Sequence, residues 1–249
     1  MPLEEIIKER SKLRIDFKQE TPILVINAVI FTISKDKLCV IMTPNKESQN
    51  GELILPGGLV MKGYSLADNI DDIVSRKIGL SKFYREQLYV FGNPCKILPD
   101  VHFVTVTYFS LVSIEKILRE VDLTKVSFVE YDNIDNISIG LNHQKIIKFA
   151  KNKLNFRLEY TTIGQYVMPH KFSIPQMQKK YEIMYGEKFD KRNFRKKVEK
   201  LEIVSFTGEY NKTDSYRPAK LYEFVNKGIE YLDDERVNLG FNGNMDIEC

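Results

Sequence analysis

The sequence predicts an α+β protein, in which an α/β/α sandwich with a mixed sheet is followed by a smaller domain of helices and a hairpin. Two observations lead to this fold class. Up to about residue 157, apolar runs rich in β-branched residues alternate with helix-like segments. Beyond that point helix-like segments dominate, until two strand-like runs close the pattern. Elements that are apolar on one side must bury that side against another layer, which gives the sandwich.

The chain of 249 residues is long enough for two domains. We expect an arm or short helix over 1–19, the sandwich over 20–157, the second domain over 158–232 and a tail over 233–249. The charged N-terminus lacks the apolar stretch of a signal peptide, and no apolar run reaches membrane-spanning length. Three widely spaced cysteines fit a reducing compartment. We therefore expect a cytoplasmic protein with no membrane partner.

The strands of the sandwich are predicted by short apolar runs between polar turns. The run TPILVINAVIFTI is rich in β-branched residues and predicts a buried strand, and VHFVTVTYFSLVS alternates strongly. We expect strands over 21–33, 38–43, 53–56, 87–92, 101–113 and 126–131.

Two helices are expected among these strands. Ser65 can cap a helix over 66–77, and Gly79 can end it because glycine readily adopts the left-handed conformation. A longer helix over 142–156 would bury one apolar stripe. The residues of that stripe are Ile146, Phe149, Ala150, Lys153 and Leu154.

The second domain has the outline of a winged helix-turn-helix. Helical segments are expected over 160–168, 174–185 and 191–200. Ser173 and Gln176 can form a capping box with Pro175 in the first turn, Gly186 can end that helix, and Asp190 can cap the next one. Two strands, over 203–210 and 218–225, then form a hairpin.

The last predicted helix carries the basic charge of the chain. Residues 188–200 hold seven Lys or Arg and two acids, a net charge of +5, whereas the whole chain carries +3. Phe194, Val198 and Leu201 share one narrow arc of the helix, so the basic side chains lie opposite a buried face. Lys and Arg neutralise phosphates, and Arg192, Asn193 or Arg195 could contact base edges in the major groove. The alternative is an ordinary solvated helix face.

Residues 53–80 resemble the Nudix box through LPGGLV, Ser65-Leu66 and Gly79-Leu80 at matching spacing. This resemblance implies a Nudix fold for about residues 20–157. In that family the box carboxylates hold the Mg²⁺ that activates a diphosphate, because hard cations need anionic oxygen ligands. This chain lacks those carboxylates, so we expect no catalytic residues, no metal and no cofactor. The replacing residues are Tyr64, Ile73, Arg76 and Lys77.

Two alternatives stay open at the box. Asp68, Asp71 and Asp72 could form a displaced metal site, or they favour a helix end and face solvent. Arg76 and Lys77 could bind the anionic groups of a ligand in place of the metal, or they are solvated surface residues.

The second half of the chain resembles the Nudix-related transcriptional regulators, the NrtR family. The motifs that carry this resemblance are LNHQKII (141–147), KFSIPQMQKKYE (171–182), FDKRNFRKK (189–197) and RPAKLYEF (217–224). The resemblance covers about residues 20–228. It implies a homodimeric bacterial repressor that binds a palindromic operator in double-stranded DNA and senses a metabolite through its Nudix-like domain. The DNA-binding residues would be Lys191, Arg192, Asn193, Arg195, Lys196, Lys200 and Arg217.

The effector that the resemblance implies is either ADP-ribose or a sugar, including arabinose or a sugar phosphate. Members that respond to ADP-ribose tend to carry an Arg-Asp-Pro-Arg run after the Phe-Gly strand. Here that place reads NPCKILPDVH (93–102), which weakens the ADP-ribose interpretation. Lys96 and His102 could line the pocket or be solvated loop residues. The effector-binding candidates are Gly58, Arg76, Lys77, Lys96 and His102.

Two other functions compete with a regulator. One is an active Nudix pyrophosphatase on a nucleotide sugar, with an appended nucleic-acid-binding module, and the missing glutamates argue against it. The other is an RNA-binding protein. Phe206 and Tyr210 fit packing within the hairpin better than base stacking. His143 and His170 are isolated, so we expect no metal role for either.

Overall fold

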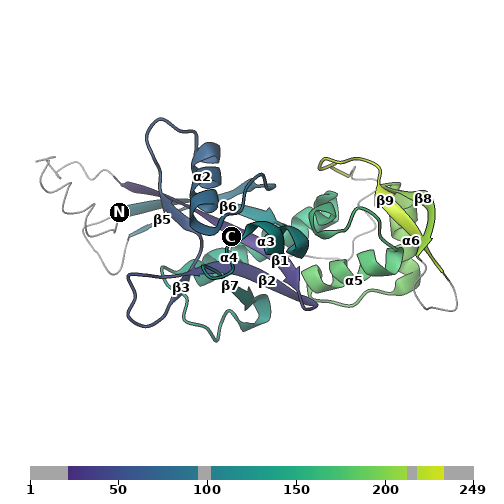
Figure 1. The fold of residues 1–249 in the computed structure, drawn as a ribbon, viewed down its shortest axis with the longest axis horizontal. Coiled ribbons are helices and arrows are strands. Elements are labelled where there is room, and N and C mark those ends of the chain that lie inside the picture. The colour runs from purple at the N-terminus through teal and green to yellow at the C-terminus, as the bar shows by residue number, and fades with distance from the viewer. Residues whose placement is uncertain (1–21, 95–101, 212–217, 233–249) are drawn as a thin grey trace, which may run out of the picture.

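The computed structural model describes residues 22–94, 102–211 and 218–232, and these residues include a mixed sheet of seven strands (Figure 1). The sheet has the order β3-β2-β1-β6-β5, with β4 paired to β1 and β7 paired to β2. Only β1 and β6 run parallel among these pairs. The strands are β1 (Ile23–Ser34), β2 (Lys37–Pro44), β3 (Leu53–Ile54), β4 (Gly57–Leu59), β5 (Glu86–Pro94), β6 (His102–Leu111) and β7 (Ser127–Glu130).

The central strand β1 sends alternate side chains into two cores. Val29 and Phe31 belong to one core, whereas Ile26, Ala28 and Ile30 belong to the other. Consecutive side chains of a strand point to opposite faces, so a strand that is covered on both faces needs a nearly continuous apolar run. The apolar run that predicted this strand therefore reflects its central place in the sheet.

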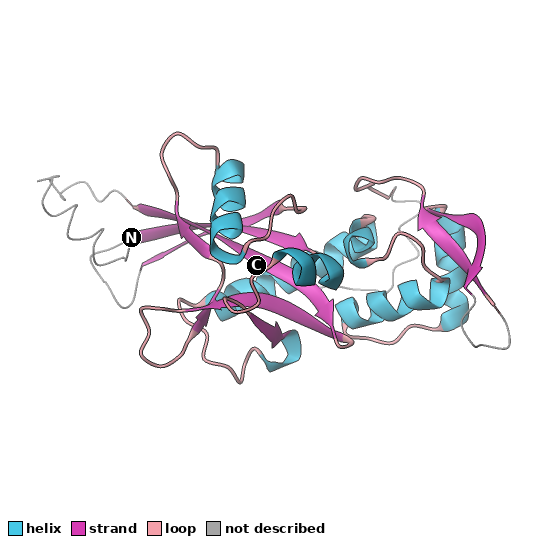
Figure 2. Ribbon diagram, viewed as in Figure 1, coloured by secondary structure: helices cyan, strands magenta, loops and turns pink. Residues whose placement is uncertain are grey.

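Helices cover both faces of the sheet and complete the predicted sandwich (Figure 2). Helices α2 (Leu66–Ile78) and α3 (Ile114–Glu120) pack in the core that contains Ile26. Helix α4 (His143–Tyr160) packs in the core that contains Phe31, and the short 3-10 turn η1 (Tyr131–Asn133) precedes it.

The structure differs from the predicted helices at two places. Helix α3 over residues 114–120 was not predicted; it begins after Ser113, whose side chain accepts the N–H of Lys116. The expected helix over 160–168 is wrong: α4 runs on to Tyr160, and only the 3-10 turn η2 (Ile163–Val167) follows. Thr161 stops α4 because its backbone is extended and its hydroxyl bonds to the carbonyl of Arg157 and the N–H of Ile163.

One stripe prediction was also wrong. Phe149 is 43% exposed, although Ile146, Ala150 and Leu154 are buried as expected. Phe149 lies at the rim of the core, where its ring contacts Tyr89 and Phe91 of β5.

The C-terminal part has the predicted helix-turn-helix and wing. Its elements are α5 (Ile174–Tyr185), α6 (Lys191–Leu201), β8 (Val204–Asn211) and β9 (Ala219–Phe224). The capping box of Ser173 and Gln176 forms, and Gly186 ends α5 in the left-handed conformation. The wing is tied back to the start of the domain, because Phe172 and Tyr222 exchange two backbone hydrogen bonds.

The two parts share one apolar core and a set of polar contacts. The core on the α4 side of the sheet continues through Leu158 and Val167 into the helix-turn-helix. Helix α4 passes through residues 157 and 158, so the predicted domain boundary falls within a helix. A polar contact also joins the two parts: Lys179 of α5 pairs with Asp36 in the β1–β2 turn at 2.5 Å. No helix within the described ranges is long and apolar enough to cross a membrane.

Candidate functional site

Helix α6 is held in a fixed rotation by its cap and its buried face. The Asp190 side chain accepts the N–H of Asn193 at 2.8 Å and starts the helix. Phe194, Val198 and Leu201 are buried as predicted. The ring of Phe194 packs on Phe189 and Tyr181, with ring centres 6.0 and 5.9 Å apart. This packing points the opposite face of α6 away from the core.

That opposite face is basic and open to solvent. All six candidate DNA-binding residues of α6 are exposed: Lys191, Arg192, Asn193, Arg195, Lys196 and Lys200. Arg195 pairs with Glu199 one turn further on, at 2.9 Å, which raises the pKa of its guanidinium. The other four cations form no ion pair within the described part of the chain, so they can meet phosphates without first breaking a contact.

Lys197 differs from its basic neighbours because it points inward. It is 7% exposed, and burial lowers the pKa of its ammonium to about 8, while Glu159 of α4 acts in the opposite direction. Lys197 therefore belongs to the packing between α6 and α4 and not to the basic face.

The wing carries two half-exposed aromatic rings. Phe206 lies 5.5 Å from Tyr210 and 6.0 Å from Tyr222 between ring centres, and the ammonium of Lys220 sits over its face at 5.2 Å. Phe206 is still 42% exposed and Tyr210 49% exposed, so the packing within the hairpin covers them only in part. Arg217, the candidate at the wing, lies outside the described residues.

The loop and helix of the box form as predicted, and a residue that the sequence analysis passed over holds them together. Ser65 caps α2, and Gly79 ends it at a φ of 85°. Asn69 is 1% exposed, and its side-chain oxygen accepts the N–H of Met61 at 2.7 Å. Its amide group also donates to the carbonyls of Met61, Tyr64 and Ser65, which fixes the whole loop before α2. Asn69 could have been recognised from the sequence as a single polar residue on the apolar face of this helix.

Each aspartate of the box helix already has a partner. Asp68 accepts the hydroxyl of Ser65 at 2.6 Å, and Asp71 pairs with Arg85 at 2.8 Å. Asp72 accepts the Nε of Arg76 at 2.8 Å, and this bond lowers the pKa of the Asp72 carboxyl. No group of three His, Cys, Asp or Glu that could hold a metal occurs in the described ranges.

The effector candidates lie in different places. Gly58, in β4, lies against Ile73 of α2, and Arg76 reaches the loop before α2, where its Nη2 is 3.7 Å from the sulfur of Met61. Lys77 is exposed on the same helix. His102 is the first residue of β6, opposite Pro94 of β5. Lys96 lies outside the described residues, so a single pocket built from all five candidates stays a prediction.

Comparison with known proteins supports both halves of this description. A curated protein of Acinetobacter baylyi, the ADPR responsive transcriptional repressor NtrR, is 25% identical over 217 residues, which is 85% of each chain. Two crystal structures share the fold. NrtR of Shewanella oneidensis complexed with a 27mer DNA has a TM-score of 0.71 at 24% identity, over 81% of this chain and 93% of that one. A MutT/nudix family protein from Enterococcus faecalis has a TM-score of 0.64 at 19% identity, over 90% of this chain and 94% of that one.

Residues 164–224 match the family model of the NrtR DNA-binding winged helix domain. Over these residues the chain is a winged helix domain of the NrtR type. The matched segment begins in η2 and ends with β9, so it contains the basic face of α6 and the described part of the wing.

In the sandwich, His143 joins α4 to the LPGG loop. Its Nδ1 accepts the N–H of Leu55 at 2.9 Å, and its Nε2 lies 3.4 Å from the side-chain amide of Asn27. Burial lowers the pKa of His143 to about 4, so the ring is neutral at physiological pH. Because Nδ1 accepts a hydrogen bond, the proton of the neutral ring resides on Nε2. This role of His143 was not predicted, because its partners Leu55 and Asn27 lie 88 and 116 residues away in the sequence.

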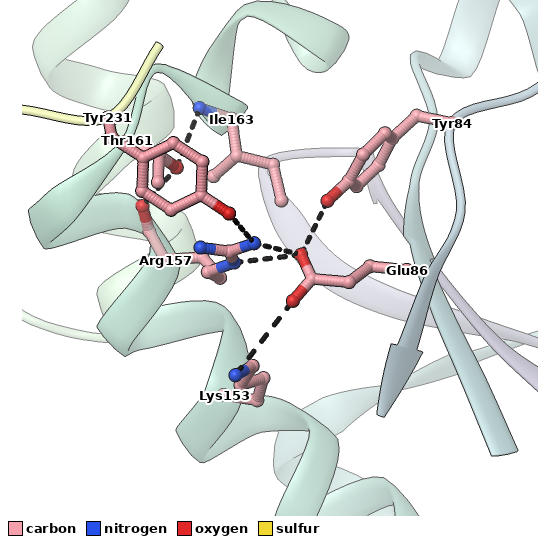
Figure 3. A network of polar contacts seen from close by, with 7 residues as sticks. All are labelled: Tyr84, Glu86, Lys153, Arg157, Thr161, Ile163 and Tyr231. Carbon is pink, nitrogen blue, oxygen red and sulfur yellow. Dashed lines mark hydrogen bonds and ion pairs between the residues drawn. The ribbon is translucent and has the colours of Figure 1, made fainter. Parts of the chain in front are cut away.

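The far end of α4 carries a second junction, shown in Figure 3. Arg157 donates to Glu86 of β5 from Nε at 2.8 Å and from Nη2 at 2.6 Å, and Nη2 also contacts the hydroxyl of Tyr231 at 2.8 Å. Tyr84 donates its hydroxyl to Glu86 at 2.6 Å, and Lys153 lies 3.8 Å from the same carboxylate. Glu86 of the sandwich thus binds Arg157 of α4. Arg157 in turn binds Tyr231, in the segment that follows the wing.

Proposed function

We propose that this chain is a DNA-binding transcriptional repressor whose Nudix-like domain senses a metabolite without hydrolysing it. The observation that carries the proposal is the basic face of α6. It is exposed, it lies in a winged helix domain of the NrtR family, and four of its cations have no ion-pair partner in the described ranges. A helix of this kind can enter the major groove of DNA while its cations neutralise phosphates.

The DNA-binding residues in this proposal are the six exposed candidates of α6 named above, without the acidic Glu199, and Arg217. A homodimer would place two such helices on the two half-sites of a palindromic operator, because a two-fold axis relates both protein and DNA. The name of the A. baylyi relative includes ADPR and repressor, which makes ADP-ribose the first effector to test in spite of the lost double arginine. A sugar or sugar phosphate is the second.

Loss of hydrolysis follows from the box. Tyr64, Ile73, Arg76 and Lys77 stand where the family has its carboxylates, and the aspartates of α2 are engaged by Ser65, Arg85 and Arg76. Lys77 is exposed on the same helix and would interact with the anionic groups of the effector, together with Arg76, which also binds Asp72. Gly58 stays an effector-binding candidate in this proposal, although a side chain at its position would meet Ile73 of α2.

A mobility-shift experiment with DNA from upstream of the gene tests the proposal. We expect a specific shift with the unmodified chain, which ADP-ribose or a sugar phosphate relieves, and no specific shift with the Lys191→Ala/Arg192→Ala variant. Steady turnover of ADP-ribose that depends on Mg²⁺ would instead favour a pyrophosphatase, and equal affinity for every DNA fragment would contradict a repressor.

A further inference from the structure

A hollow of about 100 Å³ lies where the sandwich meets the winged helix domain. It is partly open to solvent, and none of the effector candidates lines it. The segment before β5 contributes Lys82 and Tyr84, the start of α3 contributes Ser113 and Lys116, and η2 contributes Tyr166. Both domains therefore build its walls.

The polar side chains around this hollow are donors. Lys82 forms no ion pair within the described part of the chain, and it is exposed. Lys116 binds Glu120 at 2.8 Å, but Arg119 binds the same carboxylate oxygen at 3.2 Å, so a single acid serves two cations. Glu120 does not line the hollow. Ser113 accepts the N–H of Lys116 at 3.3 Å and keeps its hydroxyl proton for another acceptor.

This arrangement favours an anion of limited size. Two ammonium groups and a hydroxyl can all donate to a phosphate or carboxylate, and charge-assisted hydrogen bonds of this kind are stronger than neutral ones. With a volume of about 100 Å³ and an opening to solvent, the hollow has room for one phosphate or carboxylate group with some further atoms.

The hollow adjoins the contacts that hold the two domains together. The rings of Tyr84 and Tyr166 stack with centres 4.7 Å apart and an interplanar angle of 14°. The hydroxyl of Tyr84 binds Glu86, the carboxylate that binds Arg157 of α4. A ligand in the hollow would touch residues of both domains, so it would stabilise the arrangement in which those residues lie close together.

We propose that this junction hollow is a second ligand site, which binds the phosphate or carboxylate group of a small metabolite and favours the domain arrangement of this structure. The binding itself does not depend on the proposed function, whereas any effect on DNA does.

Calorimetric titration of the full chain with inorganic phosphate, and separately with acetate, at constant ionic strength tests the proposal. We expect saturable binding of at least one of these anions, weakened about tenfold by Lys82→Ala and by Lys116→Ala, since each removes a charge-assisted hydrogen bond. Lys125→Ala is the matched control, because Lys125 pairs with Asp122 just beyond α3 and does not line the hollow. This control should bind as the unmodified chain does.

Three results would overturn the proposal. They are no saturable binding of either anion, equal weakening by the Lys125→Ala control, and loss of binding in the Lys191→Ala/Arg192→Ala variant, which would place the anion on α6.

A further titration in the presence of ADP-ribose separates the two ligand sites. Independent binding supports a second site, and mutual exclusion contradicts it. None of these measurements uses DNA, so they succeed or fail independently of the proposed repressor function.

Discussion

At the scale of single residues, Lys151 and Lys197 differ from surface lysines because they are buried and have lowered pKa values. Lys151 of α4 is 6% exposed, and its ammonium donates to Asn155 at 2.7 Å and to the carbonyl of Tyr185 at 3.3 Å. Burial lowers its pKa to about 8, as it does for Lys197. Lys151 binds α4 to α5, and Lys197 of α6 lies within the electrostatic influence of Glu159 of α4, so the charge at this junction depends on pH.

The first prediction concerns the pH dependence of stability. In the unfolded chain a lysine has a pKa of about 10.4, so the unfolded state binds more protons between pH 8 and about 10.4. The free energy of unfolding should therefore rise with pH across that window, by up to about 3 kcal/mol for Lys151. Lys151→Met should raise stability by about 1–2 kcal/mol at pH 7 and by little at pH 10. Urea unfolding at both pH values measures this, and an equal loss of stability at both would contradict it.

The second prediction separates base contacts from phosphate contacts on α6. Arg192, in the first turn, should contact a base edge, so Arg192→Ala should weaken specific binding by about 1–3 kcal/mol and relax the sequence preference. Lys200→Ala, in the last turn, should weaken binding to all DNA equally and reduce the salt slope by about 1. Fluorescence anisotropy with operator and random DNA over a range of salt concentrations measures both effects.

Arg119→Ala, on the exposed side of α3, is the control for this pair of variants and should change neither quantity. If Arg192→Ala lowers the affinity for operator and random DNA by the same factor, Arg192 contacts a phosphate and the assignment to a base edge is wrong.

At the scale of elements, α4 connects the two halves of the molecule. Its first residue, His143, binds Leu55 at the start of the LPGG loop, and Arg157 near its end binds Glu86. A helix is stiff over this length, so a displacement of the loop by a ligand would move the end that packs on the helix-turn-helix. This gives the effector proposal a physical route to the DNA-binding face.

The third prediction tests the ion pair at the end of α4. Glu86→Gln should lower the free energy of unfolding by about 1–3 kcal/mol, because the side chain of Arg157 is only 10% exposed and would lose its counter-charge. Glu199→Gln is the matched control, since it removes an ion pair of α6 that is more than half exposed on both sides. Denaturant unfolding should show no measurable change for this control. A loss of equal size in both variants would mean that the Glu86 pair is no more than a surface contact.

At the scale of the whole molecule, the sequence predicted the features that depend on nearby residues. The caps at Ser65, Ser173 and Asp190, and the buried arc of α6, all involve partners within one or two turns. Periodicity and capping chemistry are local, so they can be read without the fold. The two-part architecture followed from them, together with the motifs of the NrtR family.

The contacts that the sequence did not reveal are those between distant residues. Glu86 and Arg157 are 71 residues apart, and His143 and Leu55 are 88 apart, so no periodic pattern links them. Helix α3 was missed because it has seven residues and only one of them, Ile117, is buried, which gives no stripe to detect. Phe149 was assigned to the core because it lies on the apolar stripe of α4. Its actual contacts, the rings of Tyr89 and Phe91 in β5, lie in another segment of the chain and cover it only in part.

A single titration that follows DNA binding and ligand consumption together tests most directly whether the chain senses ADP-ribose without hydrolysing it. A fluorescent operator fragment bound to the full chain would be titrated with ADP-ribose in the presence of Mg²⁺, and the remaining ADP-ribose would then be quantified. A sensing repressor without catalysis should release the DNA in a saturable way while all the ADP-ribose remains intact. DNA that stays bound while ADP-ribose is steadily hydrolysed would contradict the account.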